Sequence, residues 1–106
     1  MQAEEFKSIV QKILEAEIRF DGHVKKIVEN IAPERIESII SWIKSCKEGT
    51  WKAESCKNFR HWMAFIYKSS DNTIRGILIK EKNSYFIELF LDKHKYYDLK
   101  RKYLGL

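Results

Sequence analysis

The chain has 106 residues, of which 44% are hydrophobic and 33% charged, a mixture typical of one folded domain with a modest core. Its apolar runs stay well below the ~18 residues that a membrane span needs, and its acidic N-terminus is unlike a signal peptide. We therefore expect a single cytoplasmic domain over residues 1–106 that does not bind a membrane.

The net charge of +5 is distributed unevenly along the chain. Residues 1–43 carry six Lys or Arg against eight Asp or Glu, whereas residues 44–106 carry fourteen against seven. Such an asymmetry suggests a polyanionic partner such as nucleic acid, although lysine-rich surfaces also serve solubility alone. Charge by itself leaves both interpretations open.

Helices are predicted for most of the first half of the chain. Apolar spacing indicates an amphipathic helix over residues 3–16, followed at residues 17–20 by a strand or a frayed helix end. Asp21 is a candidate N-cap for a second helix. Pro33 suits the first position of a third helix, which Gly49 would end.

Three strands are predicted for the second half. Runs rich in β-branched and aromatic residues cover residues 61–67, 73–79 and 85–91, joined by short polar connections that suit hairpins. The second run is apolar at nearly every position, so we expect it at the centre of the sheet. The three runs predict an antiparallel meander.

A short helix is predicted to close the chain. Asp92 is its candidate cap, Gly105 would end it, and one side carries Tyr96, Leu99 and Tyr103, which we expect to pack against the core. The predicted fold class is α+β, with N-terminal helices packed on one face of a small twisted antiparallel sheet and a short C-terminal helix.

Cys46 and Cys56 are the two cysteines of the chain. Their spacing does not match a zinc site, and the sequence predicts neither a metal nor a cofactor. The two thiols could close a disulfide, but reduced apolar cysteines are the favoured interpretation for a cytosolic protein.

Basic and aromatic residues gather around the predicted sheet and its exit, while common catalytic signatures are missing from the sequence. Such a set can cleave RNA without a metal ion, because the 2′-hydroxyl is a built-in nucleophile and cations stabilise the charged phosphate. The imidazole of His94 titrates near neutral pH and can act as base or acid. Tyr97 is a second candidate acid, provided that neighbouring cations stabilise its phenolate form.

The order of helices, basic lead-in, three-stranded meander and basic-aromatic ending resembles the RelE/HigB-like toxins of toxin–antitoxin systems. The resemblance runs from Glu17 to Tyr103, so residues 1–16 are an extra helix ahead of a RelE-like fold over residues 17–106. It is strongest in the H-x-x-Y-D pattern that begins at His94. Arg75 stands early in a strand where the family commonly has a Tyr-Arg pair, although Ile precedes it here.

The resemblance implies an mRNA endonuclease that acts in the ribosomal A site and is held inactive by an antitoxin. Arg75 would stabilise the transition-state phosphate, with His94 and Tyr97 as the acid/base pair. The residues expected to contact the RNA backbone are Lys52, Arg60, Lys68, Lys93 and Lys95.

Two alternatives remain open at this point. The chain could be a non-catalytic module that binds RNA, DNA or a protein through its basic face, or an inactive viral or plasmid relative that forms a homodimer through its first helix. Each site residue also has a structural alternative: Arg75 paired with Glu88, His94 as a surface histidine, and residues 100–102 as a solvated helix face.

Overall fold

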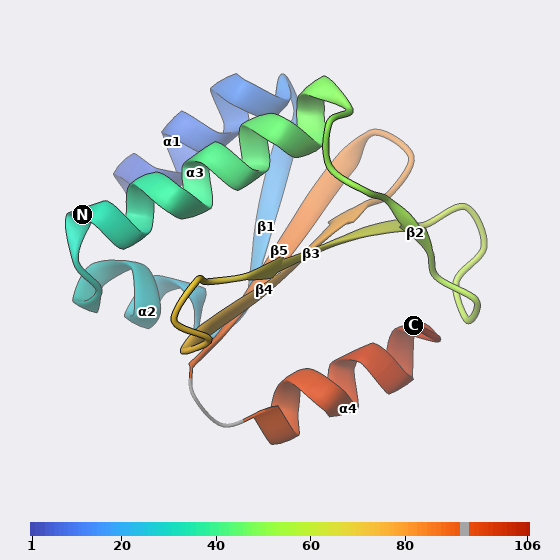
Figure 1. The fold of residues 1–106 in the computed structure, drawn as a ribbon. Helices are drawn as coiled ribbons and strands as arrows, with labels where there is room; N and C mark the ends of the chain where they lie inside the picture. The colour runs from blue at the N-terminus through green and yellow to red at the C-terminus, as the bar shows by residue number, and fades with distance from the viewer. Residues whose placement is uncertain (92–93) are drawn as a thin grey trace.

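The computed structural model describes residues 1–91 and 94–106, without the side chain of His94. Within these residues the chain forms four helices and one five-stranded sheet (Figure 1). In chain order the elements are α1 (Ala3–Leu14), β1 (Glu17–Gly22), α2 (Val24–Asn30), α3 (Pro33–Glu48), β2 (Glu54–Ser55), β3 (Met63–Lys68), β4 (Ile74–Lys80), β5 (Ser84–Leu91) and α4 (His94–Leu104). The α+β class predicted from the sequence is confirmed.

The sheet has the strand order β1-β5-β4-β3-β2. The antiparallel meander of β3, β4 and β5 is confirmed, and the apolar β4 lies in the middle as expected. β1 adds a strand that runs parallel to β5, from the Glu17–Ser84 pair to the Gly22–Leu89 pair, so the whole sheet is mixed. Residues 17–20 therefore belong to a strand and not to a frayed helix end.

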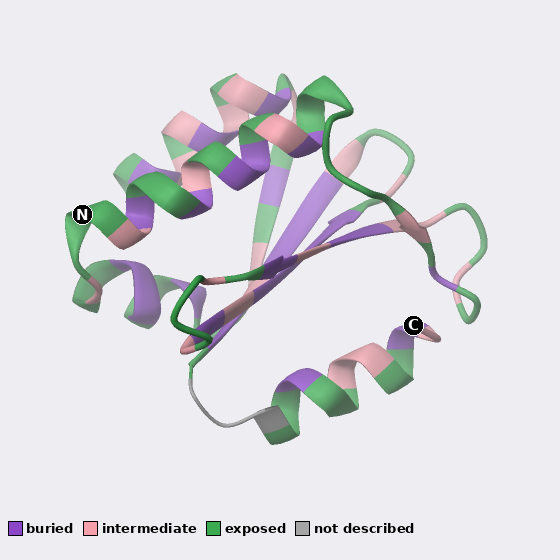
Figure 2. Cartoon of the chain, in the orientation of Figure 1, coloured by how far each residue is buried: buried purple, intermediate pink, exposed green. Residues whose placement is uncertain are grey.

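Helices cover both faces of the sheet. α1, α2 and α3 lie over one face and α4 lies over the other (Figure 1). Figure 2 shows buried residues on the sides of α1, α2 and α3 that face the sheet, where the larger core forms. A smaller core between the sheet and α4 includes Phe86, Phe90 and Tyr97. The C-terminal helix thus covers the sheet face opposite to the one that α1, α2 and α3 cover.

Trp42 of α3 packs closely against the centre of the sheet. It is 2% exposed, and its ring lies 5.1 Å from that of Tyr67. A Cβ atom added at Gly76 of β4 would come within 3.2 Å of the Trp42 ring. The glycine therefore gives the tryptophan room to approach the strand backbone.

The helix ends agree with the sequence in part. Pro33 opens α3, and Gly49 ends it with a φ of 83°, both as predicted. α1 stops at Leu14, two residues early, because Glu15 takes a left-handed conformation. The expected cap at Asp21 is wrong, because β1 continues through this residue in register with Glu88.

The apolar side predicted for α4 faces solvent. Tyr96, Leu99 and Tyr103 are 67%, 54% and 59% exposed, whereas Tyr97 and Leu104 are the buried apolar residues of the helix. α4 therefore packs through a different side from the one that the sequence indicated. The cap expected at Asp92 lies outside the described residues.

The two cysteines are free and lie on opposite faces of the sheet. Cys46 belongs to the larger core and Cys56 to the smaller one. The sheet between them prevents the disulfide that the sequence had left open, so the reduced interpretation is confirmed.

We expect both thiols to resist alkylation in the native protein. Burial raises the pKa of Cys46 to about 12 and also raises the pKa of Cys56, so little reactive thiolate is present at about pH 8. Mass spectrometry after iodoacetamide treatment should find both cysteines modified in denaturant and neither modified rapidly without it. Rapid native labelling of Cys46 would contradict its burial between α3 and the sheet.

Candidate functional site

Arg75 lies on the sheet face that α4 covers. Side chains alternate along a strand, so Arg75 shares this face with Ile77 and Ile79, while the residues between them face the larger core. Phe90 of β5 stands directly beside Arg75 and belongs to the smaller core. Arg75 is therefore placed next to the apolar surface on which α4 packs.

Two guanidinium groups contact the ring of Tyr97. The Cζ atom of Arg75 lies 5.0 Å from the ring centroid and the Cζ atom of Arg101 lies 5.7 Å from it, both within cation–π range. Tyr97 is only 3% exposed, and its ring meets Phe90 edge to face at 5.6 Å. Arg101 was not among the predicted site residues, although its spacing of four from Tyr97 on a helix is the signal that finds it.

Lys68 brings a third positive charge to the same place. It is the direct partner of Arg75 in the β3–β4 register, where like charges destabilise a sheet unless something compensates them. Within the described part of the chain, no carboxylate forms an ion pair with Lys68, Arg75 or Arg101. We call these three residues and Tyr97 the Arg75 cluster.

The hydrogen bonding of the two arginines is incomplete. Nη2 of Arg75 donates to Oδ1 of Asn72 at 3.0 Å. The Nε atoms of Arg75 and Arg101 are buried, and neither has a hydrogen-bond partner among the described residues. Positive charge and donors that have no partner among the described residues suit an anionic ligand, and phosphate oxygens are well matched to guanidinium groups.

An ion-pair network lies beside the Arg75 cluster. Nζ of Lys100 is 3.3 Å from Oε1 of Glu88 and 3.7 Å from Oδ2 of Asp21, and all three side chains are largely shielded from solvent. The alternative in which Glu88 pairs with Arg75 is therefore wrong, because α4 supplies the lysine that meets Glu88. The solvated helix face proposed for residues 100–102 is also wrong for Lys100.

Of the other predicted site residues, Lys52, Arg60 and Lys95 form no hydrogen bond, ion pair or ring contact with this cluster among the described residues. Lys52 and Arg60 are exposed in the segments before and after β2, and Lys95 is exposed in the first turn of α4. Lys93 and the side chain of His94 lie outside the described residues. Of the predicted site, the described contacts join the β4 arginine to the α4 tyrosine, with the β3 lysine beside them.

Comparison with known protein families, curated proteins and solved structures finds no match to this chain. Within residues 1–91 and 94–106, no group of three or more His, Cys, Asp or Glu is arranged to hold a metal ion. In the same part of the chain, none of the helices has the length and apolar character to cross a membrane. Function must therefore be inferred from the chemistry of the Arg75 cluster itself.

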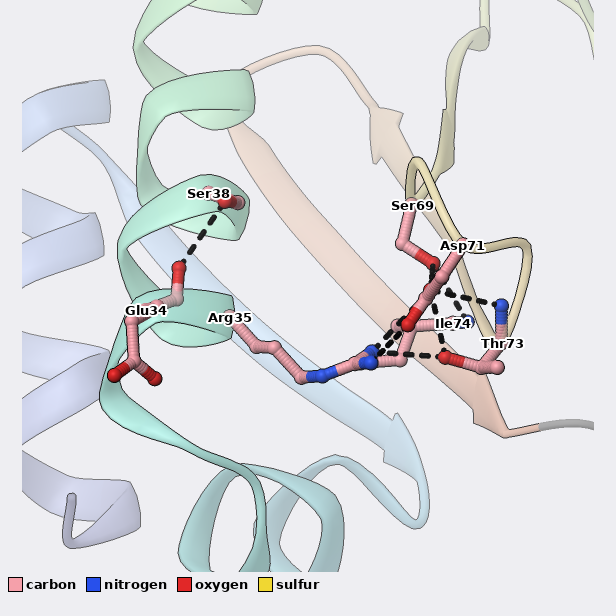
Figure 3. Close-up of polar contacts among 7 residues, drawn as sticks. All are labelled: Glu34, Arg35, Ser38, Ser69, Asp71, Thr73 and Ile74. Carbon is pink, nitrogen blue, oxygen red and sulfur yellow. Dashed lines mark hydrogen bonds and ion pairs between the residues drawn. The ribbon is translucent and has the colours of Figure 1, made fainter.

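A separate polar network joins α3 to the β3–β4 turn (Figure 3). Asp71 accepts hydrogen bonds from the hydroxyls of Ser69 and Thr73, each at 2.8 Å, and pairs with Arg35. Arg35 also donates to the Thr73 hydroxyl at 2.8 Å. Arg35, Ser69 and Asp71 border a hollow of about 230 Å³, but the groups of the network satisfy one another, so the network anchors the hairpin to the helix.

We expect Asp71→Asn to destabilise the protein in a pH-dependent way. Hydrogen bonds from Ser69, Thr73 and Arg35 hold the pKa of Asp71 well below its usual range. A lowered folded-state pKa means that the carboxylate contributes stability above about pH 4 and that this contribution is lost as the pH falls further.

Urea unfolding followed by circular dichroism should show a lower midpoint for Asp71→Asn at neutral pH. The difference from the unaltered protein should shrink below about pH 4. Asp98→Asn, at an exposed position of α4, is the matched control and should change the midpoint little. A difference that stays constant with pH would contradict the role given to Asp71.

Proposed function

We propose that this chain is a RelE/HigB-like toxin, a metal-independent endoribonuclease that cleaves mRNA on the ribosome and is neutralised by an antitoxin. The observation that supports this proposal most is the contact between Arg75 and Tyr97, at 5.0 Å, on a face that also carries Lys68 and Arg101. An mRNA phosphodiester offers the single negative charge and the non-bridging oxygens that such a cationic cluster would bind.

In the proposed reaction the RNA supplies its own nucleophile. The 2′-oxygen attacks the adjacent phosphorus, and the bond from phosphorus to the 5′-oxygen breaks, which leaves a 2′,3′-cyclic phosphate and a free 5′-hydroxyl. A base takes the 2′-proton and an acid protonates the leaving 5′-oxygen. Arg75 stabilises the charge that develops on the non-bridging oxygens.

His94 and Tyr97 carry different parts of this proposal. His94 begins α4, three residues before Tyr97, and we assign it the proton transfer for which imidazole is suited. Tyr97 is 3% exposed and touches both arginines, so it also acts as a positioning residue that holds Arg75. Lys52, Arg60, Lys68, Lys93 and Lys95 are the proposed contacts to the RNA backbone.

The burial of Tyr97 favours one alternative, a non-catalytic module that binds RNA through the same cations. A phenol that is 3% exposed offers little surface to a substrate, whereas the charges of Lys68 and Arg75 act on RNA without it. The two functions differ in their products, since a binding module leaves the RNA intact.

Induced expression without a partner protein separates the two functions. The toxin proposal expects growth arrest, with new mRNA ends detected by primer extension, and expects the Arg75→Ala/His94→Ala double variant to relieve both. Purified protein that binds RNA in a gel-shift assay while RNA stays intact, on and off the ribosome, would instead establish the binding module. If the protein neither cleaves RNA nor binds it, both functions are rejected.

A further inference from the structure

The outward side of α4 carries an exposed apolar stripe. Tyr96, Leu99 and Tyr103 follow the i, i+3, i+7 spacing of one helix side, and each is more than half exposed, at 67%, 54% and 59%. Leu91, at the end of β5, is 48% exposed and lines the same hollow as Tyr96. We call these four residues the α4 stripe. Large apolar residues gathered on one surface are typical of a docking site.

A hollow of about 610 Å³ continues the α4 stripe toward α2. Leu91 and Tyr96 line the hollow and also belong to the stripe, while Ile27 of α2 and Ile31, just after that helix, also line it. A concave apolar site of this size accepts a large side chain of a partner, as the central pockets of protein interfaces do. A flat lipid surface would leave the hollow unfilled.

The surroundings of the stripe are mostly basic, and Glu88, a carboxylate that lines the hollow, is already paired with Lys100 at 3.3 Å. Lys95 and Lys102 are exposed on α4, and Lys26 lines the hollow. α4 as a whole carries four Lys or Arg against the single carboxylate of Asp98. Two copies of this chain meeting through the stripe would bring these cations together, and juxtaposed like charges oppose association. An acidic partner removes that repulsion.

We propose that the α4 stripe and its hollow form the docking site for an acidic amphipathic helix of a partner protein. One apolar side chain of that helix enters the hollow beside Tyr96, and others at i, i+3, i+4 and i+7 spacing contact Leu99 and Tyr103. Acidic residues at the edges of the helix meet Lys26, Lys95 and Lys102. Phe90 lines the hollow and also stands beside Arg75, so the docking site borders the Arg75 cluster. The proposal nevertheless goes beyond RNA cleavage and does not require it.

Peptide titration into isotope-labelled protein tests this docking site. The peptide is a synthetic helix with leucine at i, i+3, i+4 and i+7 and glutamate at most other positions. We expect amide shifts concentrated at the α4 stripe and the hollow, and an affinity about tenfold weaker for Leu99→Ser. Asp98→Ser is the matched control, because it brings the same residue to the adjacent exposed position of α4, and it should bind the acidic peptide at least as well as the unaltered protein.

The charge requirement has its own pair of variants. Replacing Lys95 and Lys102 together by glutamine should weaken binding of the acidic peptide. The same change at Lys12 and Lys82, which are exposed but lie outside α4 and the lining of the hollow, should not weaken it. A peptide with lysine in place of glutamate should bind at least about tenfold more weakly than the acidic peptide. Equal affinity for the two peptides would overturn the choice of an acidic partner.

Three further outcomes would overturn the proposal. The first is peptide binding that Leu99→Ser leaves unchanged. The second is a dimer, measured by light scattering, that Leu99→Ser dissociates, which would make a second copy the occupant. The third is binding to vesicles of mixed neutral and anionic lipid that Leu99→Ser abolishes, with no peptide bound. Because these measurements use no RNA, their failure is distinct from a failure of the ribonuclease proposal.

Discussion

Truncation of Trp42 to alanine is expected to lower the free energy of unfolding by about 3–5 kcal/mol. Trp42 is 2% exposed, packs on Tyr67, and lies against the backbone of β4 at Gly76. Its removal leaves a cavity between α3 and the sheet that no small movement of a helix can close. Domains of this size have a total stability of about 5–15 kcal/mol, so the loss should be evident in urea unfolding followed by circular dichroism.

Two further tryptophan variants separate burial from residue type. Trp51→Ala removes an indole that is 38% exposed and donates to the carbonyl of Ile66 at 2.9 Å, so its cost should be about 1 kcal/mol. Trp42→Phe keeps an aromatic ring and removes an Nε1 that is buried without a partner among the described residues, so its cost should stay below about 1.5 kcal/mol. Equal costs for Trp42→Ala and Trp51→Ala would contradict the packing of α3.

The strands of the meander and the ends of α3 could be predicted because their signals are local. Pro33 and Gly49 mark α3 by their own backbone preferences, and the three apolar runs are bounded by polar turns. The place of β1 is not a local property. Its six residues pair with β5, more than sixty positions later, and a short run of this kind does not reveal a parallel partner.

The α4 helix shows why only part of the candidate site was predictable. Its sequence has apolar residues on two sides, one with Tyr97 and Leu104 and the other with Tyr96, Leu99 and Tyr103. Periodicity favours the longer stripe, but packing against the sheet selects the side that also brings Lys100 to Glu88. Arg101 joins the Arg75 cluster because it lies four residues after Tyr97, on the side of α4 that packs, and the sequence alone does not show which side that is.

Replacement of Arg75 by alanine is expected to slow RNA cleavage by about a hundredfold to a thousandfold if the proposed function is right. The guanidinium would act on charge that develops in the transition state, so the loss should be mainly in kcat, measured with a short RNA or on programmed ribosomes. Arg75→Lys keeps the charge but not the planar pair of donors, so it should recover only part of the rate.

Arg19→Ala is the matched control for this experiment. Arg19 lies on the edge strand β1 and stacks on an aromatic ring, with its Cζ atom 4.7 Å from the ring centroid of Phe86. Its Nε donates to Asp21 at 3.3 Å, whereas Arg75 has no carboxylate partner among the described residues. Loss of a stacked, ion-paired arginine should therefore leave the cleavage rate nearly unchanged.

Comparing the two arginine variants distinguishes chemistry from folding and from binding. If Arg75→Ala and Arg19→Ala shift the urea midpoint alike, a rate loss confined to Arg75→Ala cannot come from a weakened sheet. A rise in KM at constant kcat would mean that Arg75 holds the RNA equally in the ground state and the transition state. An unchanged rate in Arg75→Ala would remove the residue from the chemistry, because the other cations of the cluster would then suffice without it.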